Sequence, residues 1–293
     1  MDPPPQRIKC PPGITPWGWM GGQTDDPAQW TGVYIATILV AWSDFATVSK
    51  CLPKGLRADS GLIRSGRYPV TLLFGCMNDA MNRLYPFLGL NYLEVFSAIP
   101  GVYIETPDVP QDAFNGPYTY PYRGYLNRLL PCVLGWLASY PKAWKRVEYH
   151  RQDQDSPDDS FQVLPVLGGK PLLTAKFESD ADFQPLWYFK PRIADIVALI
   201  SPNVIHANLL GNGFVRSSFN MSFLENAVAW NLPDVSVEIS DPDLFPGLAG
   251  KPLVWQGLKT QDYGAARFVV AWQLVPQSSK NFKETPWPPQ WLL

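Results

Sequence analysis

The chain has 293 residues, of which 46% are hydrophobic and 17% are charged, and its net charge is −2. It is long enough to bury a large core, and a near-neutral chain without a basic cluster among aromatic residues is not expected to bind nucleic acid. No apolar run reaches the roughly 18 residues of a membrane-spanning helix, and the proline-rich start lacks the apolar centre of a signal peptide. We therefore expect a soluble, cytoplasmic protein that does not bind membranes.

Residue types with strong catalytic signatures are scarce. Neither His150 nor His206 has a second histidine or cysteine at metal-ligand spacing, so we expect no metal and no cofactor. The four cysteines contain no Cys-x-x-Cys pair and are expected to be reduced. The chain also lacks a Gly-x-Ser-x-Gly elbow and a Gly-x-x-x-x-Gly-Lys phosphate loop. Chemistry would therefore have to rest on Lys, Glu, Arg and Tyr.

Most of the elements predicted along the chain are strands. The first is almost wholly apolar, as expected of a strand buried on both faces, and Ser43 is a candidate cap for a short helix after it. Gly168-Gly169 predicts the turn of a β-hairpin within 161–179, and 192–201 has a helical apolar stripe. The predicted strands outside the hairpin are 33–42, 68–75, 92–99, 101–106, 235–240 and 267–275.

Many short strands and few helices predict a mainly β fold. We expect one domain over residues 1–293, built on a mostly antiparallel, closed β-barrel with peripheral helices. Residues 151–160 contain four aspartates and no apolar residue, which indicates an exposed loop. The proline-rich ends, 1–22 and 278–293, are expected to be extended arms. The low charge fraction and apolar ends predict a homo-oligomer.

The stretch "WLASYPKAWKR", residues 136–146, contains a lysine with two interpretations. Lys142 is either a solvated lysine at the end of a strand or a nucleophile at the mouth of an apolar pocket. Pro141 fixes its own φ and keeps the preceding residue extended, so the chain leaves the strand in one defined direction toward the lysine. If the chain is extended on both sides, Trp136 and Trp144 share the lysine's face and exclude water from its amine.

Four segments, in order, resemble the acetoacetate decarboxylase family. "SYPKAW" is similar to the segment that carries the family's Schiff-base lysine, and "TVSKCLPKGLRAD" resembles its short helix and following turn. "YLEVF" and "VYIETPD" resemble the segments with its two active-site glutamates, which correspond to Glu94 and Glu105. The resemblance spans roughly residues 30–146 and implies the family's barrel fold.

The resemblance also implies roles for single residues. Lys142 would be the nucleophile, with Glu94 and Glu105 handling protons, and a Schiff-base lysine has to be neutral, which desolvation or a neighbouring cation favours. The chain departs from the family pattern at two positions, where Ala143 replaces a second lysine and Tyr34 replaces an arginine that clamps a carboxylate. The residues expected to contact substrate are Tyr34, Trp136, Tyr140 and, as substitute clamps, Arg123 or Arg128.

Two functions follow as hypotheses. The first is a lyase that acts on a bulky apolar keto metabolite, polyketide- or terpenoid-like, through a Lys142 iminium, by decarboxylation, dehydration or retro-aldol cleavage. The second is a protein that binds a small molecule without a covalent bond, or a cyclase or isomerase, on the same barrel. Trapping with borohydride distinguishes the two, because only an iminium is reduced to a stable adduct.

Overall fold

The computed structural model describes residues 29–82, 89–105, 115–151, 159–178, 184–185, 199, 203–208, 213–222, 228–231, 234–245, 247, 251–256 and 265–277. The predicted arms, 1–22 and 278–293, and the predicted helix at 192–201, except Leu199, lie outside these residues. Within the described part of the chain, no helix has the length and apolar character to cross a membrane.

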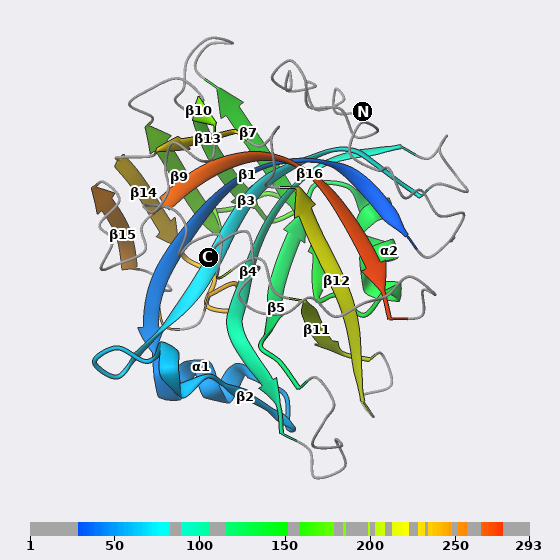
Figure 1. The fold of residues 1–293 in the computed structure, drawn as a ribbon. Coiled ribbons are helices and arrows are strands. Elements are labelled where there is room, and N and C mark those ends of the chain that lie inside the picture. Colours follow the sequence, from blue (N-terminus) through cyan, green and yellow to red (C-terminus); the bar gives the residue numbers. More distant parts are fainter. Residues whose placement is uncertain are drawn as a thin grey trace.

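Eleven strands form the larger of two sheets (Figure 1). Its long strands pair in the order β1-β3-β4-β5-β11-β12-β16-β13-β10, and β16 also pairs with β1, so the last long strand returns to the first. Two short strands, β2 and β6, pair with β4 and β5. The strands are β1 (Trp30–Asp44), β2 (Leu56–Ala58), β3 (Arg67–Asn82), β4 (Leu90–Ile104), β5 (Tyr118–Leu126), β6 (Lys142–Trp144), β10 (Gln184–Pro185), β11 (Val204–Ala207), β12 (Phe214–Ser222), β13 (Val228–Asn231) and β16 (Ala265–Pro276).

The larger sheet is mixed, which corrects the prediction of a mostly antiparallel sheet. β5 is parallel to both β6 and β11. Parallel neighbours need a crossover connection, and the helix α2 (Leu129–Leu137) provides it between β5 and β6. The mainly β fold with few helices is confirmed, because α1 (Phe45–Cys51) and α2 are the α-helical elements in the described part. Closure into a barrel stays a prediction, which the β1–β16 pairing supports.

Five strands form the second, antiparallel sheet in the order β15-β14-β9-β8-β7. The predicted hairpin is present as β8 and β9, and Gly168 and Gly169 in its connection have positive φ angles of 85° and 128°. Arg151 and Asp159, assigned to a loop from sequence, pair in β7 and β8, since the buried Asp159 carboxylate accepts a hydrogen bond from Tyr149. The strands are β7 (Arg146–Arg151), β8 (Asp159–Leu164), β9 (Leu173–Glu178), β14 (Asp234–Ile239) and β15 (Lys251–Gln256).

The strands β1, β3 and β4 are largely buried on both faces, which the continuous apolar run at 33–42 predicted for β1. One face packs on the second sheet, where the rings of Phe74 and Phe177 lie 5.0 Å apart in a core shared by both sheets. Alternate residues such as Leu73 and Phe96 face a cavity instead. The two strands predicted at 92–99 and 101–106 form the single strand β4. Burial on both faces therefore creates two separate compartments, a packed core and a cavity.

Three short elements lie between β1 and β3. Asp44, not the predicted Ser43, caps α1, because its carboxylate accepts a hydrogen bond from the Thr47 backbone N–H at 2.8 Å. The chain then runs through β2 and a short 3-10 helix, Ser60–Leu62. These elements lie along one end of β3 and β4, away from α2 (Figure 1).

Candidate active site

A cavity of about 480 Å³ lies between the larger sheet and α2. Most of its wall is apolar, and its charged lining residues are Glu94, Arg123 and Lys142. The wall is built from alternate residues of β1, β3, β4 and β5, from α2 and the turn that follows it, and from Lys142 on β6. The cavity therefore suits an apolar molecule that offers one group to a few polar side chains.

The turn after α2 aims Lys142 into the cavity. The backbone N–H of Tyr140 donates to the Gly135 carbonyl, and Ser139 takes a positive φ of 66° as the helix ends. The chain then reverses into β6, where Lys142 pairs with Gly124 of β5. Pro141 precedes the lysine directly, so the reversal is held in one direction.

Gly135 makes room for the stem of Lys142, whereas a Cβ at Gly124 would only touch it at ordinary contact distance. A Cβ atom added at Gly135 would lie 2.5 Å from Lys142 Cδ, and one at Gly124 would lie 3.7 Å from Lys142 Cγ. Glycine inside a helix costs roughly 0.5–1 kcal/mol of stability relative to alanine. The contact with the lysine stem is a steric reason for Gly135 in α2 despite this cost. Sequence reasoning missed both glycines, although a glycine within the apolar run 129–137 was a usable signal.

Lys142 and Glu94 meet inside the cavity. Lys142 Nζ lies 3.4 Å from Glu94 Oε2, and the two side chains are 20% and 5% exposed. Alternation along β4 gave Glu94 two possible sides, and the second sheet covers the other side, so the carboxylate faces the cavity. The amine also lies 5.7 Å from the ring centres of Tyr92 and Tyr140. An amine and a carboxylate thus share a site largely closed to water.

Tyr34 is another polar residue of this wall. Its side chain is fully buried and packs on Gly75, where an added Cβ would lie 2.3 Å from the tyrosine hydroxyl oxygen. No hydrogen bond of ordinary geometry reaches the buried hydroxyl, and the Glu94 carboxylate is the acidic group beside it. Burial raises the pKa of Tyr34 well above its usual value, and the Glu94 carboxylate raises it further. The hydroxyl is therefore protonated at neutral pH and can act as a donor.

Tyr140 and His206 form a buried pair beside the lysine. Their ring centres are 4.4 Å apart, and Tyr140 lines the cavity. Burial raises the pKa of Tyr140 to about 12 and lowers the pKa of His206 to about 4, so both rings are neutral at pH 7. Sequence reasoning listed Tyr140 as a substrate contact but gave His206 no part, because β11 is brought here only by its parallel pairing with β5.

Four residues expected at the site lie elsewhere. Glu105 is exposed where β4 ends, with its backbone N–H bonded to Gly55, and Arg128 is an exposed residue that precedes α2. Trp136 is 59% exposed on α2 and is absent from the cavity wall. The expected position of Trp136 assumed an extended chain, but residues 129–137 are helical, so a separation of six residues does not place it on the lysine's face. Trp144 is likewise 44% exposed.

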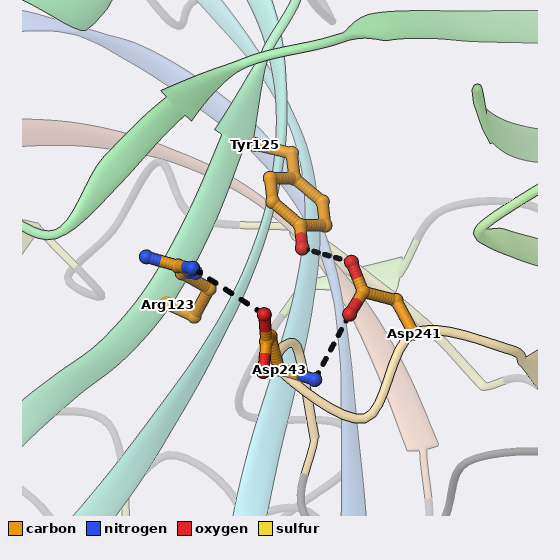
Figure 2. Close-up of polar contacts among 4 residues, drawn as sticks. All are labelled: Arg123, Tyr125, Asp241 and Asp243. Carbon is orange, nitrogen blue, oxygen red and sulfur yellow. Dashed lines mark hydrogen bonds and ion pairs between the residues drawn. The ribbon is translucent and has the colours of Figure 1, made fainter. Parts of the chain in front are cut away.

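The guanidinium of Arg123 points away from Lys142. Its Nη2 lies 3.7 Å from Asp243 Oδ2, and the neighbouring Asp241 accepts hydrogen bonds from the Tyr125 hydroxyl and the Asp243 backbone N–H (Figure 2). Arg123 and Tyr125 occupy one face of β5, whereas Gly124 faces the lysine. Arg123 lines the cavity, and its charge is paired with Asp243. Within the described residues, no group of three His, Cys, Asp or Glu side chains forms a metal site.

Comparison with known proteins identifies the fold. No protein-family model and no curated protein sequence matches the chain. The enduracididine biosynthesis enzyme MppR, complexed with pyruvate, aligns with a TM-score of 0.59 at 14% identity, covering 92% of this chain and 95% of its own. An acetoacetate decarboxylase from Legionella pneumophila aligns with a TM-score of 0.55 at 12% identity, covering 88% and 91%.

An acetoacetate decarboxylase-like enzyme from Sphingomonas wittichii aligns with a TM-score of 0.52 at 12% identity, covering 88% of this chain and 94% of its own. These alignments extend over most of each protein, beyond residues 30–146 where the sequence resemblance lies. The chain therefore has the fold of the acetoacetate decarboxylase-like enzymes, as its sequence predicted.

Proposed function

We propose that this protein is a Schiff-base-forming lyase in which Lys142 condenses with the carbonyl of a bulky apolar keto compound. The observation that carries the proposal is the Lys142 amine, 3.4 Å from the buried Glu94 carboxylate in an apolar cavity of about 480 Å³. The order of the segments around Lys142 and the fold of the solved relatives support the same assignment.

The chemistry follows from the position of the two groups. The neutral amine attacks the carbonyl carbon, and loss of water leaves an iminium that accepts an electron pair when a bond to the neighbouring carbon breaks. Glu94 lies beside the nitrogen, so its carboxylate is near the carbon α to the iminium and is placed to move a proton there. The apolar wall holds the rest of the substrate and excludes water.

Among the three lyase reactions, the charges favour dehydration or retro-aldol cleavage over decarboxylation. A substrate carboxylate needs a cation besides the iminium, but the Arg123 guanidinium is bound to Asp243 and Arg128 is exposed. One enzyme with this fold has been solved with a condensation product. It is MppR, in complex with the condensation product of pyruvate and imidazole 4-carboxaldehyde, at a TM-score of 0.58 and 14% identity.

Borohydride reduction in the presence of a small ketone such as acetone tests the proposal. We expect an adduct on the peptide that carries Lys142 and no adduct in Lys142→Ala. Lys145→Ala is the matched control, because Lys145 lies three residues further on, near the core residue Tyr125 and not on the cavity wall, and should keep full trapping. If wild-type protein gives no adduct, or Lys142→Ala retains activity, the non-covalent alternative is correct.

We also propose that two copies of the chain associate through α2. This helix and the adjacent β6 expose a group of large apolar side chains, which a lone monomer would leave in water. If α2 of one copy packs on α2 of the other, a single two-fold interface buries the exposed apolar side chains of both copies. Light scattering should show a dimer that Trp136→Glu dissociates, and a monomeric wild type would contradict it. The exposed residues are Leu129, Leu130, Val133, Trp136, Leu137 and Trp144.

A further inference from the structure

The hydroxyl of Tyr34 is a buried polar group that the chemistry above does not use. The side chain is 2% exposed, the ring lines the cavity, and the oxygen has no hydrogen-bond partner. An unpaired buried hydroxyl lowers the stability of the folded protein by about 1–3 kcal/mol. Phenylalanine at this position would avoid that cost, because it has no hydroxyl. A protein that keeps the hydroxyl there gains something from it when the cavity is filled.

The structure also supplies the room that this hydroxyl needs. Gly75 of β3 lies under the Tyr34 ring, and any larger residue there would collide with the ring and its oxygen. The polar groups of the wall thus include the amine of Lys142, the carboxylate of Glu94 and the protonated hydroxyl of Tyr34. They correspond to a nucleophile, a base and a proton donor.

We infer that Tyr34 is a catalytic acid that binds an uncharged oxygen on the carbon β to the substrate carbonyl, so that the substrate is a β-hydroxy ketone and the reaction is loss of water. The inference rests on the proposed iminium at Lys142. A β-carboxylate fits this position poorly, because the nearby Glu94 carboxylate repels it and the guanidinium of Arg123 is already paired with Asp243. A β-hydroxyl is neutral and accepts the hydrogen bond that Tyr34 lacks.

The step balances with these three side chains alone. Glu94 removes a proton from the α-carbon of the iminium, and the C–H pair forms the C=C bond of an enamine while the C=N pair moves onto nitrogen. The lone pair on nitrogen then re-forms the C=N bond, and the electron pair of the enamine C=C bond becomes the Cα=Cβ bond. The Cβ–O bond breaks at the same time, and Tyr34 protonates the leaving oxygen. Glu94 returns its proton to Tyr34. Water hydrolyses the unsaturated iminium and releases the enone and the free amine.

The test uses two probes of similar size that differ at the β position. The aldol adduct of acetone and benzaldehyde carries a β-hydroxyl and yields a conjugated enone, which is followed by its ultraviolet absorbance. Benzoylacetate carries a carboxylate and yields carbon dioxide. We expect wild-type enzyme to dehydrate the aldol adduct, and Tyr34→Phe to lower kcat for this reaction by about 100-fold or more.

Two controls separate catalysis from folding. Tyr122→Phe removes a hydroxyl from the same sheet outside the cavity wall and should leave the rate unchanged. The melting temperature of Tyr34→Phe should equal or exceed that of the wild type, since an unpaired hydroxyl is removed. Trapping of acetone on Lys142 by borohydride should persist in Tyr34→Phe, because iminium formation does not need the β-oxygen.

The outcomes are distinct for the two proposals. Absence of trapping in wild-type protein contradicts the Lys142 iminium itself. If trapping is normal, three results contradict only the assignment of Tyr34 and the β-hydroxy ketone. They are dehydration at an unchanged rate by Tyr34→Phe, no dehydration by the wild type, and turnover of benzoylacetate by the wild type that is faster than dehydration of the aldol adduct.

Discussion

Two ion pairs beside β5 have the same kinds of charge but opposite surroundings. Lys142 and Glu94 are 3.4 Å apart with side chains 20% and 5% exposed, whereas Arg123 and Asp243 are 3.7 Å apart and 39% and 72% exposed. Exposed pairs contribute little to stability, and buried pairs cost desolvation that their attraction only partly returns. The buried pair of Lys142 and Glu94, the inner pair, is therefore hard to explain by stability, whereas a chemical role explains it.

The same contrast separates the two histidines and two of the glycines. His206 is buried against Tyr140, whereas the side chain of His150 is 66% exposed beside Glu148. Gly135 lies against the stem of Lys142, whereas Gly213 has only the Asn208 amide in ordinary contact. Each inner residue thus has an outer counterpart of the same type, which makes matched experiments possible.

The largest effect is expected for Glu94→Gln. The amide keeps the shape of the side chain but cannot take a proton, so kcat for conversion of the aldol adduct should fall by about 1,000-fold. Asp243→Asn makes the same chemical change in the outer pair and should keep activity within about twofold. Steady-state rates of the two variants decide the matter, and equal losses in both would remove the distinction between the pairs.

A large stability effect is expected from His206 on acidification. Burial lowers its pKa from 6.5 to about 4, so between these values the unfolded chain binds the proton and the folded chain does not. Its contribution to stability is complete above about pH 6.5 and is lost as the pH falls toward about 4, up to about 3 kcal/mol.

Chemical denaturation at pH 7 and pH 4.5 measures this loss. The wild type should lose more free energy of unfolding between the two pH values than His206→Gln does, while His150→Gln should follow the wild type, because the His150 ring is exposed. An identical pH dependence in wild type and His206→Gln would show that burial does not hold the ring neutral.

A moderate effect is expected for Gly135→Ala. The added Cβ would lie 2.5 Å from Lys142 Cδ, so the lysine stem must move and kcat should fall by about ten- to 100-fold. Alanine is the better helix former by roughly 0.5–1 kcal/mol, so the melting temperature should change little. Gly213→Ala, where an added Cβ meets only ordinary contact, is the control. Full activity of Gly135→Ala would mean that the position of the stem is not critical.

The smallest effect is expected for the stability of Asp243→Asn. Its ion pair with Arg123 is exposed, so the free energy of unfolding should change by less than about 1 kcal/mol. The backbone N–H of Asp243 keeps its hydrogen bond to Asp241, which holds the loop in place. Urea unfolding measures the change, and a loss of several kcal/mol would show that the outer pair is structural after all.

Local patterns in the sequence were sufficient for some of the strands, and the family resemblance pointed to the candidate site residues Lys142 and Glu94. The apolar runs at 33–42 and 68–75 and the alternation around Glu94 correctly indicated β1, β3 and β4, because strand formation depends on which neighbouring residues are apolar. The order of the segments before Lys142 pointed to the amine and to Glu94, and the structure brings these two together.

Only the tertiary structure decided which side of its strand or helix each residue faces and which distant residues it contacts. The run 129–137 suits a strand or a helix, and it is a helix because β5 and β6 are parallel and need a crossover, which carries Trp136 outward and leaves Gly135 against the lysine. The second sheet covers one face of β4 and thereby turns Glu94 into the cavity, while β11 brings His206 beside Tyr140. These outcomes depend on contacts between residues far apart in the chain, which a local pattern of apolar and polar residues does not encode.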